Sequence, residues 1–517
     1  MKVSWNEETD FAPVIPRAGN RAARFLLPSL QDVIFMALFV AVIGLGPRLL
    51  NVDGDLGRHL TIGGYILDSA SIPTTDLFSH TMDGAPLTPH EWLAQVSYAM
   101  AYRLAGLDGV VILCALLIAG TFTLVYRQCL ERSGQILLSL GFTLMAAAAA
   151  SLHWLARPHL FTLLIVVLWV EVLERIRIGR TRRWWLLPVI MLAWANLHGA
   201  FLAGFAIWVV YLSGELLERG VRGLLGEAGR QSRLLLAGGL AALVTSLVNP
   251  AGWRLWETSL DFLRSGYLVG HTAEYMAPDF HLKSTWPFLG MIILSLLSFG
   301  SSRKRLSATL LLLVVSWMAM ALISTRNIPI YAVLAAPVLA LAFSQVSEET
   351  GKVGNFSRLQ ARLALVEQAL SGHLWPVIVV FLIAISLING VSLDLTRRGN
   401  RFDPQVFPVA AVDWLENQPD LGPVFNYFPW GGYLLYRTWP EQRVFIDGQT
   451  DFYGEQLTRQ YEQVITLRPG WETVLQSYGV QWVIMPPGGS LVDALETNPQ
   501  WRVVYEDGTA VILAYED

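Results

Sequence analysis

Residues 53–59 read Asp-Gly-Asp-Leu-Gly-Arg-His, and the same segment continues with Ile-Pro-Thr-Thr-Asp at 72–76 and Pro-His-Glu-Trp at 89–92. It combines carboxylates, imidazoles and an arginine with turn-forming glycine and proline. Apolar runs long enough to cross a membrane lie before and after it. A segment that only joined two helices would need none of these groups. We therefore expect a chemically active site at a membrane boundary.

The composition is that of a polytopic membrane protein. Of the 517 residues, 53% are hydrophobic and 15% are charged, and the mean hydropathy is +0.44. Soluble domains carry about 25% charged residues. The net charge of −4 comes without a basic stripe, which argues against nucleic-acid binding. The spacing of Cys114 and Cys129 fits neither a metal site nor a disulfide framework, so Cys114 is expected to pack within a span.

We expect eleven membrane spans, the first of them an uncleaved signal anchor. They are predicted at 30–48, 108–127, 135–152, 159–175, 184–197, 199–217, 233–248, 285–300, 306–323, 328–345 and 374–392.

The segments between these spans alternate in basic content. One set holds 21 Lys and Arg residues and the opposite set, without the C-terminal region, holds 8. The positive-inside rule assigns the richer set to the cytoplasm. We therefore predict a cytoplasmic N-terminal tail (1–29), a transmembrane domain (30–393) with a first outer loop (49–107), and an outer C-terminal domain (394–517). The richer set comprises 1–29, 127–134, 175–183, 218–233, 301–305 and 346–373.

Residues 91–105 fit either a short span or a helix lying on the outer membrane surface. Counting them as a span would move the five arginines of 175–183 to the outside. The stripe Trp92, Val96, Met100 and Leu104 also suits a surface helix. We therefore predict a surface helix here.

Unusual polar residues collect at the outer ends of the predicted spans. Polar groups inside lipid are costly, so this convergence indicates a shared polar cavity. Each residue taken singly also fits a helix cap or a structural hydrogen bond. The residues are His153, Arg157, His159, Asn196, His198, Asn249, Glu274, Asp279, Arg326 and Asn327.

The C-terminal region is predicted to be a small α/β domain. Strands are expected at 423–428, 443–447 and 480–485, followed by a hairpin whose strands flank Asp507-Gly508. Asp447 and Asp451 follow the second strand, which suits either a ligand site or turn chemistry. Helices are expected at 407–417, 431–438, 453–466, 471–478 and 490–496.

This architecture resembles the GT-C glycosyltransferases, membrane enzymes that use polyprenyl-phosphate-linked sugars. The resemblance covers nearly the whole chain and is more specific for fold than for substrate. A group of bacterial GT-C-like proteins shows Asp-x-Asp-x-x-x-His, Pro-x-x-Asp-x-Phe-Ser and His-Glu-Trp-Leu. The matching residues here are Asp53 to His59, Pro73 to Ser79 and His90 to Leu93, with Arg157-Pro158-His159, Asn196 to Gly199, Arg326-Asn327 and Trp430 to Tyr433.

The resemblance implies a mainly α-helical membrane enzyme of the bacterial inner membrane. A carboxylate early in the first outer loop, Asp55 or Asp53, would accept the proton of an acceptor hydroxyl as its oxygen attacks the sugar. Arg157, Arg326 or a histidine would stabilise the departing lipid phosphate. The acceptor would be a glycan, a lipid or a protein. The expected substrate-binding residues are His59, His90, Glu91, Arg157, His159, Asn196, His198, Glu274, Arg326 and Asn327.

Two questions stay open at this point. If Asp53 and Asp55 are extended, they could share Mg or Mn with His59 or Glu91, and added histidines would also suit Zn. The chain could also be a transporter, a non-catalytic lipid-binding GT-C scaffold, or a polymerase or ligase of lipid-linked glycans. A transporter should show charges within its spans and internal repeats. The spans are nearly free of mid-span charge and the sequence shows no repeat, which counts against a transporter but not against a non-catalytic scaffold.

Overall fold

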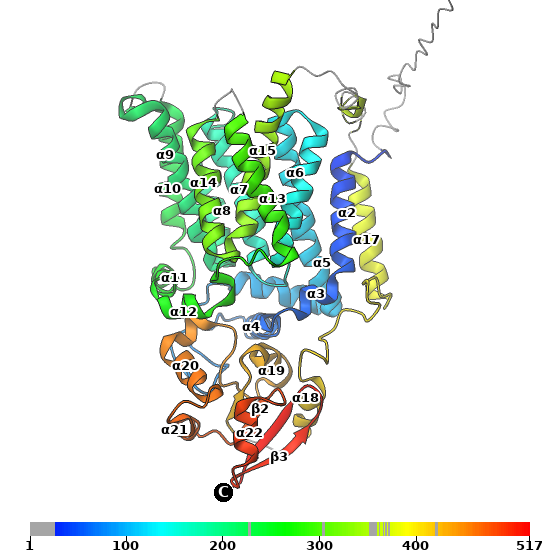
Figure 1. Cartoon of the computed structure of the whole chain (residues 1–517), viewed down its shortest axis with the longest axis vertical. Coiled ribbons are helices and arrows are strands. Elements are labelled where there is room, and N and C mark those ends of the chain that lie inside the picture. Colours follow the sequence, from blue (N-terminus) through cyan, green and yellow to red (C-terminus); the bar gives the residue numbers. More distant parts are fainter. Residues whose placement is uncertain are drawn as a thin grey trace, which may run out of the picture.

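The structure is a computed structural model that describes residues 26–225, 229–301, 306–350, 373–418 and 422–516, together with 359, 360, 362–364, 367 and 370. Most of the predicted N-terminal tail (1–25) lies outside the described residues. A helical bundle forms one end of the molecule and a small α/β domain forms the other (Figure 1).

Each of the eleven predicted spans is matched by a helix of the bundle. The helices are α2 (Leu30–Gly44), α5 (Trp92–Ser133), α6 (Ile136–Ala150), α7 (His159–Arg177), α8 (Leu186–Leu197), α9 (Leu202–Leu225), α10 (Arg230–Thr245), α13 (Trp286–Ser301), α14 (Ala308–Ile323), α15 (Ile328–Thr350) and α17 (Leu374–Ile388). Among the described residues, four helical segments are long and apolar enough to cross a membrane by themselves: 92–133, 136–153, 199–220 and 325–346. Shorter apolar helices include α2, α8, α14 and α17. The chain is a multi-pass membrane protein.

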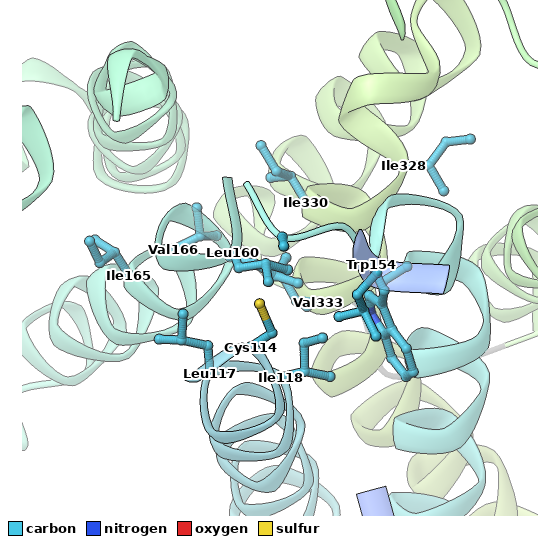
Figure 2. Close-up of a cluster of buried hydrophobic side chains, with 14 of the residues drawn as sticks. Cys114, Leu117, Ile118, Trp154, Leu160, Ile165, Val166, Ile328, Ile330 and Val333 are labelled. Atoms are coloured by element: carbon cyan, nitrogen blue, oxygen red, sulfur yellow. The ribbon is translucent and has the colours of Figure 1, made fainter. Parts of the chain in front are cut away.

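The core of the bundle lies around α5 and α15. Cys114 of α5 packs there among Leu117, Ile118, Leu160 and Val333 (Figure 2). It is buried and free of any disulfide, as expected from the sequence. Close helix contacts depend on small residues, which let backbones approach in a membrane. At Gly239 of α10, an added Cβ would lie 1.9 Å from the Trp208 ring of α9.

The expected helix at 91–105 is present as the first part of α5. The helix breaks at Ala105 and Gly106, where Gly106 has φ 59° and ψ −148°. The first part therefore runs across the ends of the upright helices (Figure 1). Met100 and Leu104 are 51% and 80% exposed, as expected for residues that face a bilayer surface.

The segment between the first two spans, predicted to be an outer loop, also contains two helices that were not expected. These are α3 (Gly46–Asn51) and α4 (Asp55–Ser69). Helix α4 contains Gly57, Gly63 and Gly64, which weaken intrinsic helix propensity. It packs between α5 and α19 (Gly431–Thr438) of the C-terminal domain. Its helical state therefore depends on tertiary contacts.

The C-terminal domain contains a four-stranded sheet in the order β1-β2-β4-β3. Strands β1 and β2 are parallel, and the other two neighbouring pairs are antiparallel. The elements are α18 (Val409–Leu415), β1 (Val424–Asn426), α19, α20 (Thr450–Ile465), α21 (Trp471–Ser477), β2 (Trp482–Met485), α22 (Ser490–Glu496), β3 (Trp501–Glu506) and β4 (Val511–Tyr515). Short helices α11 (Arg254–Arg264) and α12 (Gly266–His271) lie between the bundle and this domain (Figure 1).

The predicted strand at 443–447 is wrong. Only Val444 forms a bridge, and its partner is Ser79 of the first outer loop. The Asn426 side chain occupies the backbone groups that a ladder would need. Its Oδ1 accepts from Phe445 N at 2.8 Å, and its Nδ2 donates to Ile446 O at 2.9 Å. This segment therefore connects the sheet to the outer loop.

Candidate active site

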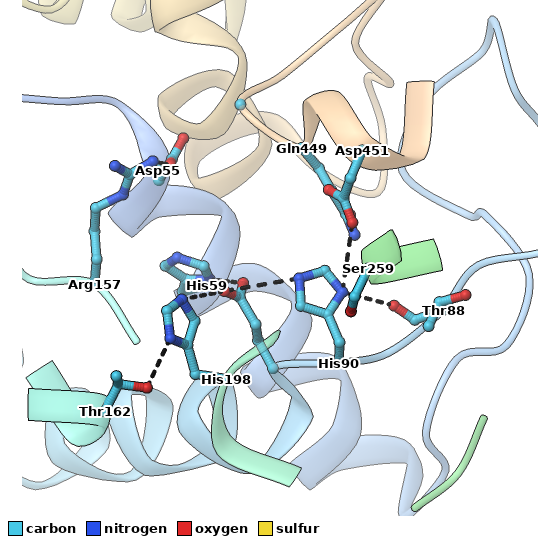
Figure 3. Close-up of polar contacts among 12 residues, drawn as sticks. Asp55, His59, Thr88, His90, Arg157, Thr162, His198, Ser259, Gln449 and Asp451 are labelled. Carbon is cyan, nitrogen blue, oxygen red and sulfur yellow. Dashed lines mark hydrogen bonds and ion pairs between the residues drawn. The ribbon is translucent and has the colours of Figure 1, made fainter. Parts of the chain in front are cut away.

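The candidate site lies where the bundle meets the C-terminal domain. The start of α4, the start of α5 and the segment before α7 contribute to it (Figure 3). So do the turn at His198 and two short 3-10 helices, η4 (Ala273–Tyr275) and η6 (Thr325–Asn327). The segment 447–451 of the C-terminal domain completes it. Regions far apart in sequence thus supply its charged side chains.

Arg157 joins three carboxylates. Its Nε lies 3.5 Å from Asp53 Oδ2, and its two terminal nitrogens form ion pairs with Asp55 and Glu274. Asp55 is the first residue of α4, and Asp53 Oδ1 accepts a hydrogen bond from Asp55 N at 3.0 Å. The two aspartates are therefore not part of an extended segment.

Glu274 extends this network to a second arginine. Arg326 Nη1 lies 3.5 Å from Glu274 Oε2, and Arg326 also stacks over Tyr275 at 5.2 Å. Burial by itself would raise the pKa of Glu274, but Arg157 and Arg326 outweigh it and lower the pKa to about 2. Glu274 is therefore an anion that holds the two guanidinium groups close together.

Glu91 lies among three imidazoles. Its carboxylate oxygens are 3.8 Å from His59 Nδ1, 3.8 Å from His90 Nε2 and 3.7 Å from His198 Nε2. Figure 3 shows these three imidazoles close together. His198 Nε2 also lies 3.3 Å from Arg326 Nη2, which joins this group to the arginine network.

The C-terminal domain contributes directly to the site. Gly448 lies against Asp55, because an added Cβ would be 1.7 Å from Asp55 Oδ1. Asp451 Oδ2 lies 3.6 Å from His90 Nδ1. Arg58 of α4 donates to Gln449 Oε1 and lies 3.6 Å from Asp447 Oδ1.

Glycines allow the two domains to approach closely here. An added Cβ at Gly54 would lie 1.8 Å from Pro429 O, and one at Gly57 would lie 2.2 Å from Gly432 O. In return, a Cβ at Gly432 would lie 2.2 Å from Gly54 O. The motif Trp430-Gly431-Gly432-Tyr433 therefore belongs to the contact between α4 and α19.

Solved structures share this architecture. An archaeal oligosaccharyltransferase, AglB from Archaeoglobus fulgidus, in complex with an inhibitory peptide and a dolichol-phosphate, aligns with a TM-score of 0.57 over 88% of this chain and 69% of its own, at 12% identity. An Archaeoglobus fulgidus oligosaccharyltransferase tethered to an acceptor peptide gives a TM-score of 0.54 over 88% of this chain and 68% of its own, at 13% identity. The chain has the GT-C fold.

A further GT-C structure is similar at a lower score. ArnT from Cupriavidus metallidurans, bound to undecaprenyl phosphate, gives a TM-score of 0.49 over 93% of this chain and 97% of its own, at 16% identity. No protein-family model and no curated protein sequence matches the chain. The two oligosaccharyltransferase alignments and the C-terminal sheet confirm the expected fold class, a GT-C-like helical membrane protein with a small α/β domain.

Within this GT-C fold, three of the predicted residues lie beside the charged network. Asn196 donates to Leu192 O and Val248 O at 2.8 and 2.9 Å, and accepts from Trp92 Nε1 at 2.8 Å. It therefore positions Trp92, the neighbour of Glu91. His159 contacts the His153 carbonyl oxygen, and Asn327 donates back to Met320 O at 3.4 Å.

Several residues of the site were not among the substrate-binding residues expected from the sequence, although the pattern at Asp447 and Asp451 suits either a ligand site or a turn. Arg58, Asp447, Gln449, Asp451 and Thr162 all contact predicted site residues or one another; Thr162 Oγ1 lies 2.9 Å from His198 Nδ1. The sequence signal was Asp447-Gly448-Gln449-Thr450-Asp451 after a predicted strand. It also fits an ordinary turn, so spacing alone could not connect it to a loop nearly 400 residues earlier.

Burial shifts the pKa of Asp53 and of His59, in opposite directions. Burial raises the pKa of Asp53, with Arg157 opposing and Glu274 adding to the effect. Its Oδ2 is buried and makes no hydrogen bond in the described part of the chain, although Arg157 is nearby. Burial lowers the pKa of His59 well below its usual value, and Arg58 and His90 lower it further.

The four residues expected to bind a metal, Asp53, Asp55, His59 and Glu91, do not come together around one point. Across the described residues, no three His, Cys, Asp or Glu side chains are arranged to hold a metal ion. Arg157 places its own positive charge beside Asp53 and Asp55. Of the four proposed ligands, His59 and Glu91 lie together, while the two aspartates face the arginine. The four residues expected to bind a metal therefore do not form a single metal site.

Proposed function

We propose that this chain is a membrane glycosyltransferase that transfers a sugar from a polyprenyl-phosphate-linked donor to an acceptor hydroxyl on the outer face of a bacterial inner membrane. The observation that carries the proposal is the Arg157 network at one end of a GT-C bundle, in which Arg157 contacts Asp53, Asp55 and Glu274, and Glu274 also contacts Arg326. The AglB structure with the same fold contains a dolichol-phosphate, which supports this class of donor.

Asp55 is proposed as the catalytic carboxylate. In the reaction, an acceptor oxygen forms a bond to the anomeric carbon while the bond from that carbon to the phosphate oxygen breaks. The proton of the acceptor hydroxyl passes to Asp55, and polyprenyl phosphate leaves. Asp55 is fixed for this role by the first turn of α4, by its ion pair with Arg157 and by the wall at Gly448.

Asp53 is the alternative base. Its pKa is raised by burial, which makes it a stronger base than an ordinary aspartate once ionised. Against this role, Asp53 Oδ1 already accepts from Asp55 N at 3.0 Å, so the residue helps to start α4. We therefore assign proton transfer to Asp55 and support of the helix start to Asp53.

The arginines are proposed to bind the donor phosphate. Charge-assisted hydrogen bonds from guanidinium groups suit phosphate, and they become more favourable as charge develops on the leaving oxygen. Arg157 and Arg326 are held on opposite oxygens of Glu274. Glu91 and the imidazoles around it would line the path of the sugar, and one of them, His198, lies beside Arg326.

The test uses the full-length protein reconstituted with radiolabelled polyprenyl-phosphate sugars. Asp55→Asn should lower the rate of transfer by at least about 100-fold, the usual contribution of a general base. Asp68→Asn is the matched control, because Asp68 lies in the same helix and is 74% exposed. Its rate should equal that of the wild type.

Other outcomes discriminate between the alternatives. Loss of transfer in Asp53→Asn, with normal transfer in Asp55→Asn, would assign the base to Asp53. An inactive wild type with every donor would favour a non-catalytic lipid-binding scaffold or a transporter.

A further inference from the structure

A second polar pocket lies at the end of the bundle opposite the candidate active site. It is formed by the last turns of α5 and α7, the start of α14 and the later part of α15. It has about 870 Å³ of space, counting the part that is open to solvent. Nothing in the proposed transfer reaction uses it.

The pocket has charged and apolar walls. Arg132, Arg175, Arg177 and Arg180 supply positive charge, and the apolar wall includes Leu306 and Leu341. Such a combination suits a ligand that has both a negative group and a hydrocarbon part.

Two of these arginines are neutralised by carboxylates. Arg175 lies 3.1 Å from Glu131 and also pairs with Glu171. Arg177 lies 2.8 Å from Glu174 in its own helix.

The other two arginines make no direct contact of this kind. Within the described ranges, neither the Arg132 nor the Arg180 guanidinium forms a direct ion pair or a side-chain hydrogen bond, although Arg132 is near enough to interact with the charge of Glu174. Arg132 lies in the last turn of α5, and Arg180 follows α7 by three residues. Their charge is therefore available to a ligand in the pocket.

We propose that this pocket binds the phosphate headgroup of an anionic phospholipid. Guanidinium groups pair well with phosphate oxygens, and basic pockets between transmembrane helices are suited to anionic headgroups. The pocket lies at the ends of spanning helices, which is the depth of the headgroup layer. The leucine wall contacts the beginning of an acyl chain. Free phosphate would gain nothing from that wall, so the ligand is a lipid.

The experiment measures phospholipid binding by the full-length protein. Native mass spectrometry in a neutral detergent would compare phosphatidylglycerol with phosphatidylcholine. The wild type should prefer phosphatidylglycerol, and Arg132→Gln/Arg180→Gln should bind it about tenfold more weakly. Arg230→Gln is the matched control, because it removes an arginine at the start of α10 and outside the pocket. Its binding should be unchanged.

The single variant Arg180→Glu keeps the test valid if the double variant does not fold, because Arg180 is exposed. It should also weaken phosphatidylglycerol binding. Equal binding of both lipids by the wild type would overturn the proposal. So would equal weakening in Arg230→Gln, or full competition by inorganic phosphate at millimolar concentration, which would identify a soluble anion as the ligand.

Discussion

Arg157 shows how single residues determine the charge of the site. Its guanidinium and that of Arg326 face the carboxylates of Asp53, Asp55 and Glu274. If all five groups were ionised, the cluster would carry one negative charge in excess and would oppose an incoming phosphate. Burial raises the pKa of Asp53, which favours a proton there and reduces that repulsion.

Gly448 tests whether the C-terminal domain positions Asp55. In Gly448→Ala the new Cβ would lie 1.7 Å from Asp55 Oδ1, so the carboxylate must move. A displacement of about 1 Å in a reacting group costs about 100-fold in rate. We expect sugar transfer to fall by that order. Gly508→Ala, where an added Cβ meets open space, should transfer normally. Wild-type transfer by Gly448→Ala would contradict this positioning role.

The lowered pKa of His59 leads us to expect that the stability of the folded protein depends on pH. The folded pKa of His59 is lowered, first by burial and then by Arg58 and His90. Below about pH 6.5 the unfolded chain binds a proton at this residue while the folded chain does not. Stability is therefore highest above that pH and falls as the pH decreases.

Thermal unfolding of the purified protein at pH 7.5 and pH 5.5 measures this effect. The Tm of the wild type should fall more between these values than the Tm of His59→Gln. His281→Gln, at an exposed histidine, should retain the wild-type decrease. Identical decreases in all three proteins would show that His59 does not contribute.

At the scale of elements, α4 packs between the helical bundle and the C-terminal domain. It supplies Asp55, Arg58 and His59 to the site on one side and packs against α19 on the other. Its glycines lower its propensity, so its helical state depends on the neighbours that those glycines admit.

Two glycine substitutions within α4 should have opposite effects. Gly57→Ala places a Cβ 2.2 Å from Gly432 O, a backbone atom, and should lower the free energy of unfolding by about 1–3 kcal/mol. Gly64→Ala meets nothing within 4 Å and should raise it by up to about 1 kcal/mol through helix propensity. Denaturant titration measures both. Equal changes would mean that the α4–α19 contact does not limit stability.

At the scale of the whole molecule, the arginine distribution predicts which end of the bundle faces outward. Twenty-one basic residues belong to one set of connections and eight to the other, when the C-terminal domain is left out of the count. The positive-inside rule therefore predicts that the C-terminal domain and the candidate site face outward and that the proposed phospholipid pocket faces the cytoplasm.

A phosphatase that is active only outside the cytoplasm tests this orientation. Fused after Asp517 it should be active, and fused after Gly134, in the turn between α5 and α6, it should be inactive. The reverse pattern would place the site in the cytoplasm and would contradict the proposal that sugar transfer occurs on the outer face of the membrane.

The sequence by itself determined the spans and the clustering of polar residues at their ends. A span needs about 20 apolar residues, which is a local property of the chain. Polar groups within lipid are costly, so polar residues gather at the ends of spans and can be identified once the spans are predicted. Arg157, Glu274 and Arg326 follow from this pattern, whereas Asp55 follows from the motif at the start of the first loop and from the GT-C resemblance.

Only the tertiary structure decided which other residues and elements join these residues in the candidate site. The helix α4 depends on packing that its own glycines do not reveal. The expected strand at 443–447 was replaced because the Asn426 side chain occupies its backbone groups. Gly448 and Asp451 reach Asp55 and His90 through the folding of a separate domain onto the bundle. Contacts between residues this far apart in sequence depend on how whole elements pack, and no local pattern encodes them.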